Sequence, residues 1–356
     1  MTGSQARAQQ GDIASAAAER GPLAMEAVSL SKDFRLGRRQ VLHAVRDVSF
    51  GLYRGAVVAL VGESGSGKST VARLLTGQER PSSGSIRLDG GPVNLASRRA
   101  FRQHKSKVQL VFQDPFSSLN PVHTVRYHLE RPVKLHQGTR NRHEVGRETA
   151  ALLEQVRLTP PGTFLAKFPH ELSGGQRQRV SFARALAARP SVLLADEPVS
   201  MLDVSIRLEM LSLLDDLRRR FQLALLYITH DIASARYFAD ELLVMYAGQI
   251  VERGPAEDVT QQPAHPYTQL LVASAPDPDN LATGLRDGAR STRARADAAG
   301  PAADGCPFSP RCPLADDRCR AENPALRRVA ARRAAACWHV ETAAPGLFAA
   351  SQGGGT

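Results

Sequence analysis

The sequence VGESGSGKST, at residues 61–70, decides the fold of this chain. It fits the pattern G-x-x-x-x-G-K-[ST] from Gly62 to Ser69, in which a glycine-rich loop turns backbone N–H groups toward the oxygens of a phosphate. An apolar run at 56–61 precedes the loop, and residues with helical spacing follow it. The sequence therefore predicts a strand, a phosphate-binding loop and a helix N-terminus, where the helix dipole favours an anion.

The residue types in this loop predict what each contributes to a nucleotide site. Lys68 is expected to reach the β- and γ-phosphates of a nucleoside triphosphate, and the hydroxyl of Ser69 is expected to bind Mg²⁺. The full set predicted to hold the nucleotide here is Gly62, Ser64, Gly65, Gly67, Lys68, Ser69 and Thr70. Kinases, GTPases, helicases and transport ATPases all use such a loop, so the rest of the chain must decide among them.

A second backbone anion site is predicted at ELSGGQRQRVSFARALAARP, residues 171–190. Ser173 and Gln176 have the spacing of a capping box, which predicts a helix start at Ser173 and a helix that stops before Pro190. Gly174 and Gly175 leave the N-terminus of that helix free of side chains. Two sites in one chain cannot easily hold the same phosphate from opposite sides, which suggests a dimer with nucleotide between its subunits.

Three further apolar strands are predicted to end in polar side chains. The run SVLLADEP, 191–198, delivers Asp196 to a Mg²⁺ ion and places Glu197 beside it to polarise an attacking water. The runs LALLYITHD, 223–231, and VQLVFQDPFSSLNP, 108–121, lead to His230 and Gln113. Because ligands of open parallel sheets bind at the carboxyl ends of the strands, we expect these ends near the phosphate-binding loop.

These motifs, in this order, resemble the nucleotide-binding subunit of an ABC transporter. The resemblance implies that GESGSGKS is the Walker A loop, Gln113 the Q-loop, LSGGQ the signature and LLADE the Walker B strand. It also implies a D-loop at Ser200–Asp203 whose Asp203 faces nucleotide, a switch histidine at His230 and an adenine-stacking aromatic at Phe34. Taken singly, Gln113 and His230 fit strand-end polar residues and Phe34 fits the core. The D-loop reads SMLD where the family more often has SALD, so the packing of Met201 across a dimer stays open.

Within that family, the phrases VFQDPFSSLNP, HELSGGQRQR, DEPVSMLDVS and HPYT at 265–268 are similar to the ATPases of oligopeptide and dipeptide importers. The resemblance covers about residues 25–340. It implies MgATP hydrolysis by Glu197, His230 and Gln113, with Ser69, Gln113 and Asp196 at the Mg²⁺. It further implies two integral-membrane permease subunits, a homologous second ATPase or a second copy of this chain, and an extracytoplasmic binding protein. Relatives that import nickel, glutathione or sugars leave the substrate open.

Length and composition predict one large α/β domain with a small appendix in the 356 residues. We expect a disordered lead-in at 1–22, an ABC-type P-loop ATPase core at 23–274 with a helical subdomain at about 114–185, a linker at 275–304 and a cysteine-containing region at 305–345. No apolar run reaches the ~20 residues of a membrane span, and no signal peptide is evident. The expected location is the cytoplasmic face of the cell membrane, where the chain meets its permeases.

The four cysteines all follow the expected ATPase core, at Cys306, Cys312, Cys319 and Cys337. Their separations of five, six and seventeen residues lack the C-x₂₋₄-C knuckle of common zinc sites. Disulfides are disfavoured in a reducing compartment. A [4Fe–4S] cluster, which the family resemblance implies for some members, is expected ahead of zinc, with four free thiols packing a small domain as the remaining alternative.

The formal net charge of +11 raises the alternative of a nucleic-acid partner. The basic clusters at 98–107, 218–220 and 327–333 lie far apart in sequence and lack interleaved aromatics, so solvated faces and attraction to an anionic membrane surface explain them better. The rival function is a soluble ABC ATPase that acts on ribosomes or nucleic acid. Such proteins usually carry two ATPase cores or a long coiled-coil insertion, and this chain shows neither.

Overall fold

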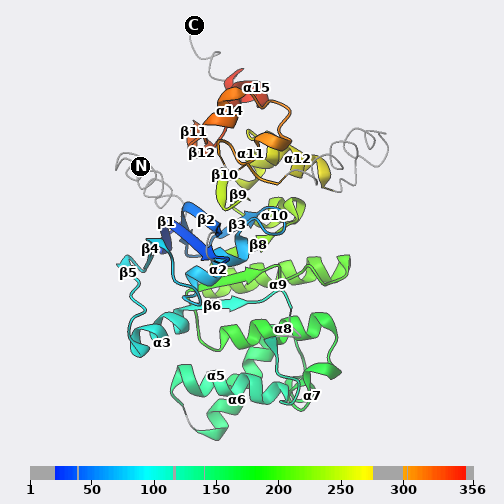
Figure 1. Ribbon diagram of the computed structural model, residues 1–356. Coiled ribbons are helices and arrows are strands. Elements are labelled where there is room, and N and C mark those ends of the chain that lie inside the picture. The colour runs from blue at the N-terminus through cyan, green and yellow to red at the C-terminus, as the bar shows by residue number, and fades with distance from the viewer. Residues whose placement is uncertain are drawn as a thin grey trace. The chain divides into compact units, whose positions relative to one another are not determined.

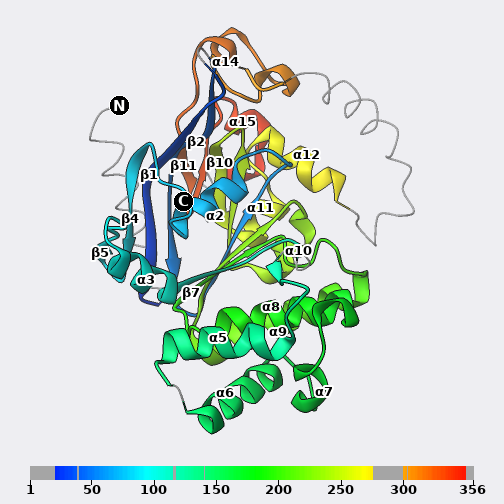
Figure 2. The same cartoon turned by 60° about the horizontal axis from the view of Figure 1, so that its bottom comes forward.

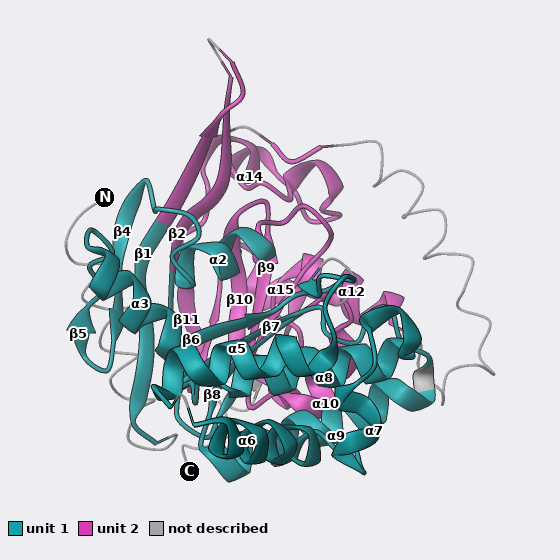
Figure 3. Ribbon diagram, turned by 90° about the horizontal axis from the view of Figure 1, so that it is seen from below, with its two compact units in different colours: residues 1–30, 49–57, 69–228 teal, residues 31–48, 58–68, 229–356 magenta. Residues whose placement is uncertain are grey.

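The computed structural model describes residues 21–37, 40–114, 118–139, 141–275, 300–302 and 304–349. The expected lead-in, apart from its last two residues, and nearly all of the expected linker lie outside these described residues. The chain divides into two compact units, each built from three segments (Figure 3). Unit 1 comprises residues 1–30, 49–57 and 69–228, and unit 2 comprises residues 31–48, 58–68 and 229–356.

Two long strands, β1 (Leu23–Arg35) and β2 (Val41–Tyr53), contribute residues to both units. Strand β3 (Val57–Val61) lies in unit 2 except for its first residue, and α2 (Lys68–Leu75) lies in unit 1 except for its first residue. The loop between β3 and α2 is the predicted phosphate-binding loop. All five residues of β3 are buried, as expected for a parallel strand covered on both faces.

Unit 1 holds a parallel run of strands and most of the helices. Strand β7 (Val192–Asp196) pairs in parallel with β6 (Val108–Val111) on one side and with β8 (Ala224–Thr229) on the other. Its other strands, β4 (Ser83–Leu88) and β5 (Gly91–Pro92), pair antiparallel. The remaining elements are α3 (Arg98–Lys107), α5 (Val125–Gln137), α6 (Arg142–Gln155), α7 (Pro161–Leu165), η1 (Pro169–Glu171), α8 (Gly174–Leu186) and α9 (Val204–Phe221).

Helices α5, α6, α7 and α8 gather at one end of unit 1, at the bottom of Figures 1 and 2. Each longer helix begins at a side chain that accepts from its own first turn: Thr124 caps α5, Asn141 caps α6 and Ser173 caps α8. The sequence placed a helical subdomain in this part of the chain, and the structure contains these helices there. None of the helices in the described residues has the length and apolar character that crossing a membrane requires.

Unit 2 contains a sheet with the strand order β11-β12-β10-β9-β3. Strands β9 (Glu241–Tyr246) and β10 (Gln249–Pro255) form a hairpin that turns at Ala247-Gly248, and both turn residues have positive φ, as a type I′ turn requires. Strand β9 also pairs in parallel with β3. The helices are α10 (Ile232–Phe238), α11 (Ala256–Gln261), α12 (Pro266–Ser274), η3 (Ser309–Arg311), α14 (Asp317–Ala321), α15 (Val340–Ala343) and α16 (Gly346–Ala349).

The cysteine-containing region is joined to this sheet. Strand β12 (Arg333–Ala335) pairs antiparallel with β10, and β11 (Arg327–Ala330) pairs antiparallel with β12. Buried Arg333 donates to the carboxylate of buried Glu252 on β10 over 3.0 Å. The sequence predicted an appendix beyond a linker but no strand in it, so this continuation of the sheet is a finding of the structure.

Glu252 also fixes the HPYT segment, residues 265–268. Its carboxylate accepts from the amides of Ala264 and His265, both over 2.9 Å. Burial lowers the pKa of His265 to about 3, so the ring is neutral, and its Nδ1 accepts from the amide of Tyr267 at the start of α12. These contacts hold Tyr267, which is completely buried, against Tyr246 of β9, whose ring centroid lies 4.6 Å from its own.

Candidate functional site

The phosphate-binding loop is shaped by close backbone approaches at two of its glycines. A Cβ at Gly62 would lie 2.1 Å from the carbonyl oxygen of Met245, and a Cβ at Gly67 would lie 2.2 Å from that of Ala44. Gly67 and Gly65 also have φ values of +105° and +80°, which side chains disfavour. Gly62 and Gly67 therefore cannot carry side chains without moving the loop, while Ser64 and Gly65 at the tip are exposed.

Lys68 lies over the backbone of this loop. Its side chain is only 4% exposed, and its Nζ donates to the carbonyl oxygens of Gly62 over 2.7 Å and of Glu63 over 2.8 Å. An ammonium group held on this loop provides the positive charge that a triphosphate needs. Ser69 and Thr70 follow in the first turn of α2, as predicted.

In unit 1, the two acids of the predicted Walker B strand occupy the end of β7. Asp196 is the last residue of the strand, and Glu197 comes next with φ +45°. A non-glycine residue in this region is strained, and such strain is often found at functional sites. The amide of Glu197 donates to the carbonyl of Ile228 over 2.8 Å, which fixes the backbone of the acid against β8.

Gln113 and Glu197 meet in unit 1. The side-chain Nε2 of Gln113 donates to Oε2 of Glu197 over 3.0 Å, although the two residues are 84 positions apart. Gln113 lies two residues beyond β6 and is exposed. The structure thus brings the predicted Q-loop residue to the predicted catalytic base.

The signature segment has the predicted capping box. The hydroxyl of Ser173 accepts from the amide of Gln176 over 3.3 Å, and the side chain of Gln176 accepts from the amide of Ser173 over 3.1 Å. The two glycines differ in their surroundings, because a Cβ at Gly175 would lie 3.0 Å from Cγ2 of Ile206, whereas one at Gly174 would meet only Leu202 at 3.6 Å. Gly175 therefore serves close packing of α8 on α9, a role that the sequence did not reveal.

The D-loop leads from the catalytic acid to α9. The hydroxyl of Ser200 donates to the carbonyl of Glu197 over 3.0 Å, and Asp203 occupies the N-cap of α9. Met201 is 61% exposed. An exposed methionine next to the N-terminus of a helix is available to a partner surface, where its flexible side chain adapts to the shape that it meets.

Phe34 and His230 belong to unit 2. Phe34, on β1, is half-buried, and the Nζ of Lys32 lies 4.8 Å from its ring centroid. His230 is exposed and directly follows β8.

All four cysteines line one small cavity in unit 2, together with His265, Phe308 and Trp338. Each thiol is free of disulfide bonds. Burial raises the pKa of all four thiols, and it acts with the charge of the neighbouring cysteines to raise that of Cys337 to about 11. The amide of Cys306 donates to the carbonyl of Cys319 over 2.7 Å, so segments that are distant in the sequence converge here.

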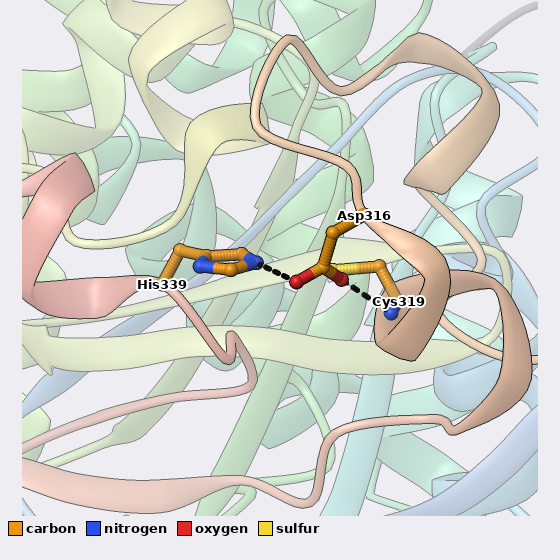
Figure 4. Close-up of side chains that lie close together, drawn as sticks. All are labelled: Asp316, Cys319 and His339. Carbon is orange, nitrogen blue, oxygen red and sulfur yellow. Dashed lines mark hydrogen bonds and ion pairs between the residues drawn. The ribbon is translucent and has the colours of Figure 1, made fainter.

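Two side chains that sequence reasoning missed connect these cysteine segments (Figure 4). Asp316 accepts from the amide of Cys319 over 2.8 Å, and its other oxygen lies 3.1 Å from Nε2 of His339. The backbone amide of His339 donates to the sulfur of Cys337 over 3.4 Å. Ligand atoms of Asp316, Cys319 and His339 lie within 4.8 Å of one another, a set of oxygen, sulfur and nitrogen that suits a transition metal.

The phosphate-binding loop also has contacts that the sequence did not indicate. Glu63, which the motif leaves unspecified, binds Arg311 of the cysteine region and donates its amide to the hydroxyl of Tyr267. Arg311 and Tyr267 carry no local signal for this role, since they are 248 and 204 residues away from Glu63.

Comparisons with known proteins identify the family of this chain. The chain matches the family model of the ABC transporter over residues 45–200, and that of the oligopeptide/dipeptide transporter C-terminal region over residues 251–319. The di/tripeptide transport ATP-binding protein DppF of Pseudomonas aeruginosa is 41% identical over 316 residues, which cover 88% of this chain and 94% of that protein. A putative peptide import ATP-binding protein of Brucella ovis is 42% identical, covering 84% of this chain and 93% of that one.

Solved structures give the same result. The cbiO1 protein of Clostridium perfringens, part of the ABC transporter complex cbiONQ, matches with a TM-score of 0.60 and 27% identity over 67% of this chain and 91% of that one. A dimeric ATP-binding cassette in a post-hydrolysis state with ADP and phosphate matches with a TM-score of 0.59 and 27% identity, covering 65% of this chain and 98% of that one.

The fold and the motifs define an ATPase of the ATP-binding cassette class, which confirms the fold class predicted from the sequence. The chain belongs to the ABC transporter family, in the branch whose ATP-binding subunits carry the oligopeptide/dipeptide transporter C-terminal region. Membership implies ATP and Mg²⁺ as substrate and cofactor.

Proposed function

We propose that this chain is the ATP-hydrolysing motor of an importer for di- or oligopeptides and drives separate permease subunits. One observation carries the proposal: Gln113, in the segment that we propose faces the permease, hydrogen-bonds Glu197, the expected base of ATP hydrolysis. A change at one residue therefore reaches the other directly. The names of the relatives support a peptide substrate.

In the proposed mechanism, ATP binds the loop 62–69 of one subunit and Ser173–Gln176 of the other. The ammonium group of Lys68 exchanges its hydrogen bonds to the loop carbonyls for hydrogen bonds to phosphate oxygens. Phe34 stacks on the adenine ring. Ser69, Gln113 and Asp196 would hold Mg²⁺, which neutralises phosphate charge when bound. Glu197 orients a water for in-line attack on the γ-phosphate, and His230 contacts that phosphate. Asp203 and exposed Met201 face the other subunit. We propose that this subunit is a homologous ATPase rather than a second copy of this chain.

A cavity of about 520 Å³ in unit 1 is the proposed docking site for the permease. It lies between the end of β6 and helix α5, and Phe112, Tyr127 and Leu135 in its lining are exposed. Exposed aromatic and aliphatic side chains beside a cavity are typical of a protein interface. Through this contact the subunit would lie peripherally on the cytoplasmic face of the membrane.

The test is to trap the Glu197→Gln variant with MgATP in native membranes, isolate it by a tag and identify its partners by mass spectrometry. We expect two multi-spanning permease subunits, with or without a second ATPase and a solute-binding protein. The Tyr127→Asp variant should not recover the permeases, because it places a charge in the proposed docking site. The control variant Tyr237→Asp, at an exposed site in unit 2, should still recover them. Recovery of ribosomes or nucleic acid without membrane proteins would support the soluble rival instead.

We further propose that Cys306, Cys312, Cys319 and Cys337 hold a [4Fe–4S] cluster. The donor set fits, because four free thiols line one cavity. Among the described residues, no three of these sulfurs lie within 4.8 Å of one another. A single zinc ion bound by four sulfurs at about 2.3 Å would hold them about 3.8 Å apart. The sulfurs are not gathered that closely here, and four thiolates are also the ligand set of a [4Fe–4S] cluster.

Iron, zinc and acid-labile sulfide should be measured on protein purified without oxygen. We expect about four iron and four sulfide per chain, and a loss of both in Cys337→Ser. His339→Ala separates the two donor sets, because it removes a ligand of the Asp316, Cys319 and His339 group and leaves all four cysteines. Retained iron in His339→Ala supports the cluster. If the protein contains zinc and His339→Ala loses it, the metal belongs to the group of Asp316, Cys319 and His339. If the protein is colourless and free of metal, the four thiols only pack the small domain.

A further inference from the structure

Glu63, the second residue of the phosphate-binding loop, is held at its amide, its carbonyl and its carboxylate. The amide donates to the hydroxyl of Tyr267 over 2.9 Å, and the carbonyl accepts from Nζ of Lys68 over 2.8 Å. Both carboxylate oxygens accept from Arg311, over 2.8 and 2.9 Å. Glu63 is therefore constrained at its backbone and at its side chain.

The contact with Arg311 is of the strong, bidentate kind. The side chain of Arg311 is 8% exposed, although that of Glu63 is 41% exposed. The guanidinium also lies near the rings of Tyr246 and Phe308, at 5.8 and 5.6 Å from their centroids. The two parallel hydrogen bonds and the surrounding rings fix the orientation of the guanidinium group of Arg311. A single surface ion pair would not fix it.

Arg311 lies on a short turn, residues 306–312, that begins and ends with a cysteine. The turn is anchored by Phe308, which is buried against Tyr246, Tyr267 and His265 with ring centroids 5.3 to 5.8 Å apart. Its first residue is fixed by the hydrogen bond from Cys306 to Cys319. The position of Arg311 therefore depends on the packing of the cysteine region.

We propose that Arg311 is a positioning residue for nucleotide binding, through which the turn 306–312 controls the affinity of the phosphate-binding loop. The inference rests on the proposed use of this loop for MgATP. A free carboxylate on Glu63 would repel a triphosphate bound to the same loop. Arg311 compensates this charge and holds the carboxylate, while Tyr267 holds the amide of the same residue.

The test is the Kd of MgATP, measured by calorimetry on the full chain, together with kcat at saturating ATP. We expect Arg311→Gln to raise Kd about tenfold, the factor that about 1.4 kcal/mol gives, and to leave kcat within about twofold. Glu63→Gln should change Kd by less than about threefold, because its neutral side chain no longer repels the triphosphate. For the same reason, the double variant Glu63→Gln with Arg311→Gln should bind MgATP like Glu63→Gln alone. Arg320→Gln, an exposed arginine of the same region, is the matched control.

The double variant distinguishes positioning from general support. If Arg311 only stabilised the cysteine region, adding Glu63→Gln to Arg311→Gln would not restore the affinity for MgATP, and this result would overturn the proposal. A wild-type Kd in the Arg311→Gln variant would overturn it as well. Should Arg311→Gln fail to fold, as judged by thermal unfolding, Arg311→Lys replaces it, with an expected rise of about threefold because one bond remains. A wild-type chain that binds no MgATP would refute the proposed function itself.

Discussion

The Glu197→Gln variant is expected to bind MgATP as tightly as the wild type and to hydrolyse it about 10² to 10⁴ times more slowly. The amide is nearly the same size as the carboxylate and can still accept from Gln113, so the loop should keep its shape. It cannot polarise a water, however, because it lacks the negative charge. Steady-state phosphate release and nucleotide binding, measured on the same sample, separate the two effects.

The control for this prediction is Glu154→Gln, which removes an exposed carboxylate from α6 in the same unit. It should hydrolyse ATP at the wild-type rate. Turnover in Glu197→Gln within a few-fold of the wild type would show that another group is the base. A parallel loss of ATP binding would indicate instead that the strained backbone at this position, with φ +45°, had changed.

Replacement of Lys68 by alanine is expected to weaken MgATP binding about a hundredfold. The buried ammonium donates two hydrogen bonds within the loop and is predicted to transfer them to phosphate oxygens. Charge-assisted hydrogen bonds contribute about 1.5 kcal/mol or more each, so two give about 3 kcal/mol, or about a hundredfold in Kd. Equilibrium binding of a fluorescent ATP analogue would measure the change.

Lys134→Ala provides the comparison for Lys68→Ala, since Lys134 is a partly exposed lysine that pairs with Glu130 on the same helix. It should bind ATP normally. If Lys68→Ala bound nucleotide with wild-type affinity, the loop would not be the triphosphate site. Chemical denaturation should accompany both measurements, because Lys68 also bridges two carbonyls of its own loop.

The sequence predicted the parts of the site that depend on local patterns. The glycine loop and the capping box at Ser173 are each encoded within a few neighbouring residues, and the structure contains both. The order of motifs predicted the fold class, because alternating apolar strands and helices build a parallel sheet with polar strand ends. The assignment of each site residue to ATP or Mg²⁺ stays a prediction.

The sequence could not predict the contacts that join distant segments. No local feature singles out Arg311 among 46 lysines and arginines as the partner of Glu63. Strands β11 and β12 are short and rich in arginine and alanine, which have little preference for strands. They are defined only by strand pairing, of β12 with β10 and of β11 with β12. Gly175 was likewise given a role at the helix N-terminus, whereas its packing against Ile206 needs the fold.

The pairing of β12 with β10 has a consequence for the solubility of the chain. A strand at the edge of a sheet offers unpaired backbone groups to other molecules, and such edges promote aggregation. Strand β12 covers β10, and the outermost strand of this part of the sheet is β11, which begins with the exposed charges of Arg327 and Arg328. Like charges there repel a second edge. A chain shortened before β11 would instead present the bare edge of β10 and leave the carboxylate of Glu252 without its arginine.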